Sequence, residues 1–115
     1  MESLCAPRAL YVTGNTDYVW LSNKSLYANS RATQKVYSTL GIADRIGFCV
    51  NGGHGHCQLP ASQNGELDYF LDRFMLDKKE LSTCVATVPA SFADVDVDRW
   101  TKWWGTGDPV LPPLK

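Results

Sequence analysis

Residues 50–60 read VNGGHGHCQLP and hold both histidines of the 115-residue chain, His54 and His56. They follow the apolar run RIGFCV at 45–50, which predicts a buried strand that ends where Asn51 and two glycines begin. A glycine-rich loop at the end of a buried strand lies at the surface and can present side chains to a ligand. The sequence therefore places the two histidines at one edge of a sheet.

Before this loop, the sequence predicts a strand at 9–13 and an amphipathic helix at 23–40. The run ALYVT at 9–13 favours β-structure and is bounded by Pro7 and Gly14. Within 23–40 an apolar residue recurs at every fourth position, and Gly41 stands where a helix commonly ends in a left-handed residue. The recurring residues are Ala28, Ala32, Val36 and Leu40.

After the loop, a second helix is expected to run from an N-cap at Asn64 to about Asp77. Its apolar residues have the i, i+3, i+4, i+7 spacing of one helix face and are Leu67, Phe70, Leu71 and Phe74. The order strand, helix, strand, helix predicts an α/β fold in which the two strands are parallel. Two parallel strands leave an unpaired edge, so we expect further strands from residues before Met1.

The remaining residues, 79–115, show no sustained periodicity apart from a predicted helical turn at 98–104. We expect two units: residues 1–78, the βαβα portion of a larger sheet domain, and 79–115, a mostly irregular extension. This extension should wrap the surface, and its tryptophans should cover apolar area.

Composition limits the partners of the chain. Hydrophobic residues make up 44% and charged residues 20%, with a formal net charge of −1 and no blocks of like charge. This balance suits a globular domain and argues against nucleic acid or an anionic membrane as a partner. No apolar run approaches the roughly 18 to 20 residues of a membrane span.

A histidine on a loop after a strand is placed to take a proton from a nucleophile, as the catalytic base of an α/β-hydrolase does. The alternative is that Gly52 to Gly55 forms a tight turn with a polar tip. A metal site built from His54, His56 and Cys57 has H-x-H spacing but lacks a fourth ligand, so we expect no metal and no cofactor.

The loop after the first strand, residues 14–22, offers two further candidates. Asp17 can be the acid that orients the histidine, or a residue that only shapes the turn. Trp20 can stack on a sugar or belong to the core. No G-x-S-x-G motif occurs and no serine follows a strand in an elbow setting, so the nucleophile is expected outside this chain.

Several motifs together resemble the C-terminal part of glucuronoyl esterases, carbohydrate esterase family fifteen, over about residues 4–77. The tail motifs at 99–101 and 103–104 look more like the bacterial-type members. The motifs that carry the main resemblance lie at 6–10, 15–20, 39–41, 45–48 and 53–58, with Pro60 and Ser62-Gln63.

The resemblance implies a secreted, metal-free serine esterase of the α/β-hydrolase fold. Its substrate would be the ester between the 4-O-methyl-glucuronic acid of glucuronoxylan and lignin alcohols. In this family's order the nucleophile lies upstream of Met1, in a missing N-terminal part of the domain. A truncated, non-catalytic domain that at most binds glucuronoxylan is the alternative.

The same resemblance implies roles for individual residues. His56 is the base, His54 supports it without touching the substrate, and Asp17 matches one position of the orienting acid. Trp20 lines the glucuronate pocket. Cys57 would form a disulfide with a cysteine beside the nucleophilic serine.

Overall fold

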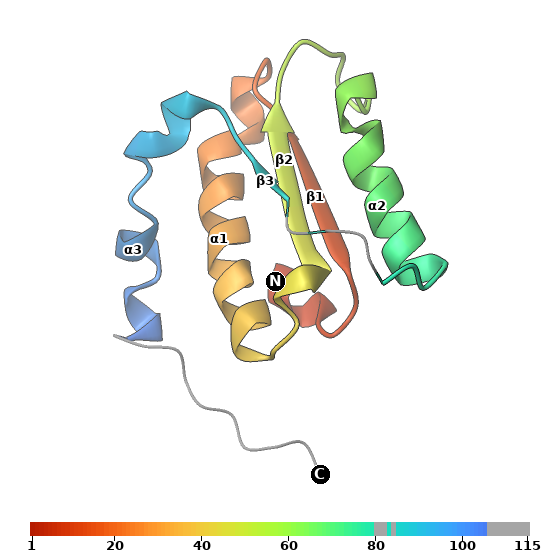
Figure 1. Cartoon of the computed structure of the whole chain (residues 1–115). Helices are drawn as coiled ribbons and strands as arrows, with labels where there is room; N and C mark the ends of the chain where they lie inside the picture. The colour runs from red at the N-terminus through yellow and green to blue at the C-terminus, as the bar shows by residue number, and fades with distance from the viewer. Residues whose placement is uncertain (80–82, 84, 106–115) are drawn as a thin grey trace.

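The computed structural model describes residues 1–79, 83 and 85–105, and its centre is a parallel sheet with the strand order β1-β2-β3 (Figure 1). Strand β1 spans Leu10–Asn15, β2 spans Ile46–Asn51 and β3 spans Ala86–Thr87. The register pairs Leu10 with Ile46 and continues to Asn15 with Asn51, so β1 and β2 end level with each other. The predicted α/β fold with its two parallel strands is confirmed.

Two helices cover opposite faces of this sheet (Figure 1). Helix α1 spans Asn23–Thr39 and α2 spans Asn64–Met75. Successive residues of a strand point to opposite faces. Phe48 accordingly packs against Tyr27 of α1 with ring centroids 5.9 Å apart, while a side chain on Gly47 would meet the Phe70 ring of α2. Strand β2 is buried from Ile46 to Val50 because it is covered on both faces and paired on both edges.

Helix α1 ends as the sequence predicts. Gly41 has a φ of 73°, and its N–H donates to the carbonyl of Ser38 at 2.9 Å. The N–H of Ile42 donates to the carbonyl of Tyr37 at 3.0 Å, which completes a Schellman motif. Glycine suits this position because it has no Cβ to oppose the left-handed backbone.

The predicted N-cap of the second helix is wrong. Asn64 has helical angles (φ −57°, ψ −44°) and is the first residue of α2, and Gln63 occupies the cap position. The reason is the 3₁₀ turn Ala61–Gln63, which already brings the chain into a helical path before Asn64.

Strand β3 is a third strand that the sequence did not predict, and it comes from the tail; the further strands expected from residues before Met1 stay a prediction. It lies in the 79–115 unit and pairs with β2 through Phe48 with Ala86 and Cys49 with Thr87. Its two residues are too few to show a period in the sequence. The boundary between the units 1–78 and 79–115 stays a prediction.

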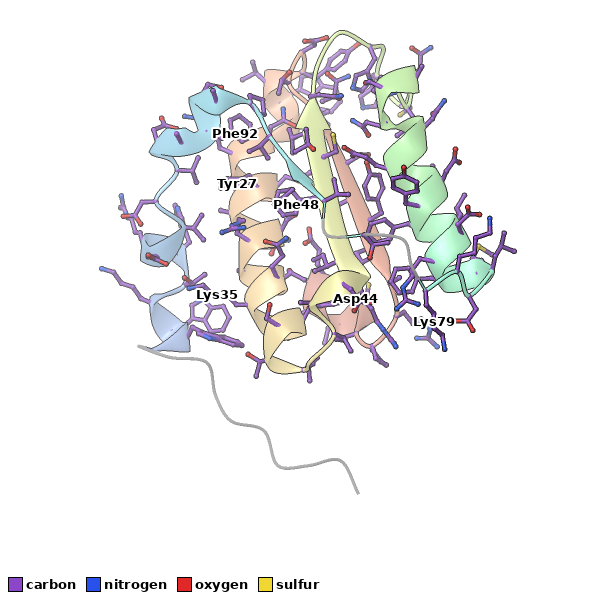
Figure 2. All side chains as sticks on the ribbon, in the orientation of Figure 1. Tyr27, Lys35, Asp44, Phe48, Lys79 and Phe92 are labelled. Atoms are coloured by element: carbon purple, nitrogen blue, oxygen red, sulfur yellow. The ribbon has the colours of Figure 1, made fainter. Side chains whose placement is uncertain are left out.

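The rest of the described tail packs along α1. Phe92, in the 3₁₀ turn Ala90–Asp94, is buried and lies 5.8 Å from the ring of Tyr27; Figure 2 shows both side chains beside Phe48. Helix α3, Val97–Trp100, and the 3₁₀ turn Lys102–Trp104 correspond to the predicted helical turn at 98–104.

Two tryptophans of this tail differ from the expectation that they cover apolar area. Trp100 is 63% exposed and Trp103 is 66% exposed, because their segment lies at the outer side of α1 (Figure 1). Within the described ranges, no helix is long and apolar enough to cross a membrane.

Candidate active site

The candidate site is built by two loops that leave the carboxyl ends of neighbouring parallel strands. We call residues 16–22 the Trp20 loop and residues 52–60 the histidine loop; they follow β1 and β2 respectively. Because the strands are parallel and end level, the two loops meet at the same edge of the sheet, where α/β proteins place their ligands.

Asn15, the last residue of β1, joins the two loops. It is only 5% exposed, and its Oδ1 accepts the N–H of Asp17 at 3.0 Å. Its Nδ2 therefore faces the histidine loop, where it donates to the carbonyl of His54 at 2.9 Å and lies 3.1 Å from His54 Nδ1. The main-chain carbonyl of Asn15 accepts from Asn23 Nδ2 at 2.7 Å, which links this junction to the start of α1. Sequence reasoning missed Asn15; its signal was an amide side chain at the end of an apolar strand.

The side chain of Asp17 binds the main chain of the histidine loop. Its Oδ2 accepts the N–H of Gly53 at 2.7 Å, and no hydrogen bond joins it to either imidazole within the described part of the chain. A Cβ on Gly52 would collide with the side chains of Thr16 and Asp17, so this close approach of the loops requires glycine. The predicted orienting acid is thus beside the loop but not on the histidine ring.

His56 lies exposed within an aromatic cluster. The main-chain N–H of His56 donates to the hydroxyl of Tyr18 at 3.0 Å. The centroid of its imidazole ring lies 5.0 Å from that of the Trp20 ring and 5.4 Å from that of the Tyr18 ring. Trp20 is 69% exposed, so it offers an indole face beside the imidazole instead of filling the core. Cys57 Sγ is 3.0 Å from His56 Nδ1. Tyr18 was not among the sequence candidates, because nothing local distinguishes it from a core tyrosine.

His54 points inward, unlike His56. Its Nε2 is buried and has no hydrogen-bond partner in the described structure. His54 lines a hollow of about 370 Å³, and His56 and Gln63 line the same hollow. Gln63 is 1% exposed and donates to Asn51 Oδ1 at 2.7 Å, while its Oε1 is also unpartnered. Buried polar atoms are normally paired, so these groups are available to a ligand or to another part of a protein.

The described residues offer few groups that could act as a nucleophile or bind a metal. No cluster of three or more His, Cys, Asp or Glu residues suited to a metal occurs among the described residues. Burial raises the pKa of the Cys49 thiol to about 11, so this thiol is protonated and unreactive at neutral pH. Cys57 is exposed and unpaired here; its disulfide stays a prediction, and Cys84 lies outside the described residues.

Comparison with known proteins gives a consistent result. Residues 1–41 match the sequence model of a family described as glucuronyl esterase of fungi. The chain is 42% identical over 113 residues to 4-O-methyl-glucuronoyl methylesterase 1 of Phanerochaete chrysosporium, and 39% identical over 105 residues to 4-O-methyl-glucuronoyl methylesterase of Cerrena unicolor. These matches cover 96% and 90% of this chain but only 23% and 22% of the relatives.

Solved structures match as well, over most of this chain. The fold superimposes with a TM-score of 0.82 on a glucuronoyl esterase from Sporotrichum thermophile, a serine-to-alanine variant in complex with methyl 4-O-methyl-β-D-glucopyranuronate. That match is 33% identical and covers 95% of this chain and 28% of the enzyme. The catalytic domain from Hypocrea jecorina matches with a TM-score of 0.77 at 27% identity. The likeness thus extends past residue 77 into the tail, and these fungal matches lend no support to a bacterial type there.

Proposed function

We propose that this chain, which corresponds to a segment of a glucuronoyl esterase, supplies the catalytic histidine and part of the sugar pocket. The complete enzyme would hydrolyse the ester between the 4-O-methyl-glucuronic acid of glucuronoxylan and lignin alcohols. The observation that carries this proposal is the exposed imidazole of His56 beside the exposed indole of Trp20 at the carboxyl edge of the sheet. The matched enzyme from Sporotrichum thermophile, bound to a methyl glucuronate, supports the substrate class.

In the proposed reaction, His56 takes the proton of a serine hydroxyl that another part of the enzyme supplies. The serine oxygen then attacks the uronate ester, and the protonated imidazole returns the proton to the departing alcohol. A water molecule then attacks the acyl-enzyme, with His56 again taking and returning the proton, and this step releases the uronic acid and the serine. Tyr18 and Trp20 fix the position of His56, and Asp17 fixes the loop through Gly53. His54 supports the loop from the buried side.

The proposed enzyme acts outside the cell, where its polymeric substrate is found. An exposed Cys57 that pairs with a cysteine from the rest of the enzyme would be stable in that oxidising environment. Its partners would then be the glucuronoxylan–lignin ester and the N-terminal part of the hydrolase domain.

The proposal is tested with a chimaera in which this chain replaces the matching segment of the Phanerochaete chrysosporium relative. We expect the purified chimaera to hydrolyse a benzyl glucuronate ester. A folded, monomeric chimaera without turnover would favour the alternative, a non-catalytic domain. That alternative has one observation in its favour: no serine hydroxyl bonds to either imidazole among the described residues.

Trp20→Ala in the chimaera should weaken glucuronate binding and leave the fold intact. A buried Trp costs about 3 to 5 kcal/mol when truncated, but the 69% exposure of Trp20 predicts a much smaller loss. Calorimetric titration with methyl glucuronate and a thermal melt measure the two effects. A large drop in Tm with unchanged affinity would assign Trp20 to the core.

A further inference from the structure

A groove of about 570 Å³ runs between α1 and the C-terminal segment, apart from the two loops of the candidate site. One wall is the outer side of α1, and the other is formed by Asp94 to Asp96 and the turns that follow. Trp100 and Trp103 line it and are both mostly exposed. Their relative position is fixed, because Trp103 Nε1 donates to the carbonyl of Trp100 at 3.0 Å. The groove therefore presents to solvent two indole groups whose relative position is fixed.

The groove combines apolar surface with hydrogen-bonding groups. Ala28 and Ala32 of α1 contribute small apolar side chains, while Ser25 and Asn29 of the same helix contribute a hydroxyl and an amide. A pyranose has the matching character, with apolar C–H faces that stack on an indole and hydroxyls around the ring edge.

The charges that line the groove compensate one another. Lys24 Nζ lies 2.7 Å from the carboxylate of Asp94, and Asp96 accepts the main-chain N–H of Arg99 at 3.0 Å. The guanidinium of Arg99 lies over the Trp100 ring, 5.8 Å from its centroid. Two cationic and two anionic side chains thus line the same space, which favours an uncharged polar ligand over an anion or a cation.

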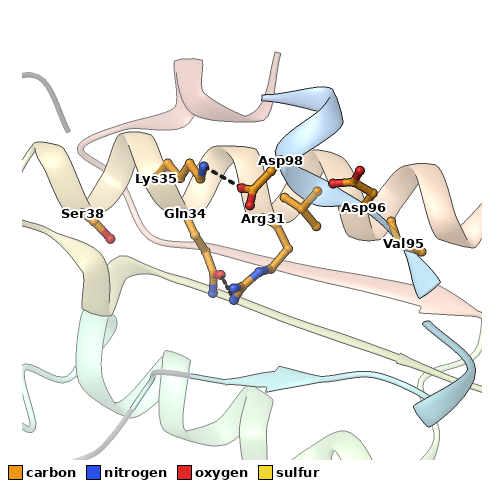
Figure 3. A pocket seen from close by; sticks show the side chains of 8 residues that line it. Arg31, Gln34, Lys35, Ser38, Val95, Asp96 and Asp98 are labelled. Carbon is orange, nitrogen blue, oxygen red and sulfur yellow. Dashed lines mark hydrogen bonds and ion pairs between the residues drawn. The ribbon is translucent and has the colours of Figure 1, made fainter. Parts of the chain in front are cut away.

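A second hollow on the other side of α3 lacks these features (Figure 3). Most of the side chains that line it are polar, and four of them bond in pairs: Arg31 donates to Gln34 at 2.9 Å, and Lys35 pairs with Asp98 at 3.4 Å. No aromatic side chain lines it, so it offers no stacking surface. Of these two hollows in the described part of the chain, the aromatic groove is the one that suits a sugar chain.

We propose that the aromatic groove binds the uncharged xylose backbone of glucuronoxylan, as a second contact beyond the uronate site. This inference rests on the proposed function. Helix α1 begins at Asn23, directly after the Trp20 loop, and Lys24 lies at the groove, so the groove starts at the same end of the sheet as the candidate site. A polymer whose uronate side group occupies the site can continue along α1 toward Trp100 and Trp103.

The test compares a polymeric with a small substrate in the chimaera. The double variant Trp100→Ala, Trp103→Ala should raise KM for ester-bearing glucuronoxylan by roughly tenfold, the loss of one to two stacking contacts. Hydrolysis of benzyl glucuronate should be unchanged. Tyr69→Ala is the matched control, because Tyr69 is an exposed aromatic on α2, which covers the opposite face of the sheet.

Three outcomes would overturn the inference. KM for the polymer is unchanged in the double variant; or both substrates lose activity equally; or Tm falls by several degrees with polymer binding intact, which shows that the rest of the enzyme covers the groove. Retardation in a gel containing unesterified xylan reports binding even if the chimaera has no turnover, so failure of the groove and failure of the esterase proposal are distinguishable. Trp100→Phe, Trp103→Phe should keep the retardation and confirm stacking.

Discussion

His56→Ala in the chimaera is expected to lower kcat for benzyl glucuronate by roughly three to six orders of magnitude, as the loss of a catalytic base does in serine hydrolases. The exposed imidazole of His56 lies beside Trp20 and Tyr18, and under the proposed function it accepts the proton of a serine from the rest of the enzyme. Without the imidazole, the serine proton has no acceptor in the attacking step. Steady-state kinetics with circular dichroism on the same sample give the measurement.

His54→Ala is the matched control for His56→Ala. The two histidines belong to the same loop, but His54 Nε2 is buried, and the main-chain carbonyl of His54, not its ring, holds the shortest bond to Asn15. We expect a loss of about tenfold to a hundredfold, typical of residues that support a catalytic group. Equal losses for the two variants, or full activity of His56→Ala, would contradict the role given to His56.

The 115-residue chain alone is expected to show no hydrolysis of glucuronate esters above that of free imidazole at equal concentration. An imidazole without a positioned nucleophile and oxyanion hole cannot supply the covalent route. Within the described structure, neither His56 nor His54 hydrogen-bonds to a serine, and the buried Cys49 thiol has a raised pKa. The rate of ester hydrolysis should therefore differ between the chain and the chimaera by the full rate enhancement of the enzyme over free imidazole.

A benzyl glucuronate assay on the chain, with His56→Ala as its control, decides this point. Turnover by the chain that survives His56→Ala would falsify both the role of His56 and the location of the nucleophile elsewhere. Turnover that is lost in His56→Ala would keep the role of His56 but place a nucleophile on this chain, and Cys57, 3.0 Å from His56 Nδ1, would be the first candidate.

The main elements of the fold followed from the sequence because each carries its own local signal. Apolar residues at every fourth position in 23–40, and apolar runs at 9–13 and 45–50, predicted α1, β1 and β2. Gly41 marked the end of α1, since its left-handed backbone conformation is unfavourable for a residue with a side chain. Strand β3 gave no such signal. It consists of two exposed residues whose β-structure depends on hydrogen bonds to β2.

The residues proposed for the site divide in the same way. His56 and Trp20 could be named as candidates because their residue types are chemically distinctive and each follows a strand. Asn15 and Tyr18 were missed because their partners lie 39 and 38 positions away, and only the parallel register of β1 and β2 brings them together. The same register placed Asp17 on the main chain of Gly53 and not on an imidazole.

The sequence by itself thus determined the α/β class, the parallel pairing of the two main strands and the loops that carry the candidate groups, because hydrophobic period and residue type act locally. Only the tertiary structure decided which atoms of the two loops meet, that a third strand comes from the tail, and that Trp100 and Trp103 face a groove. These depend on the positions of segments far apart in the chain, which local spacing does not encode.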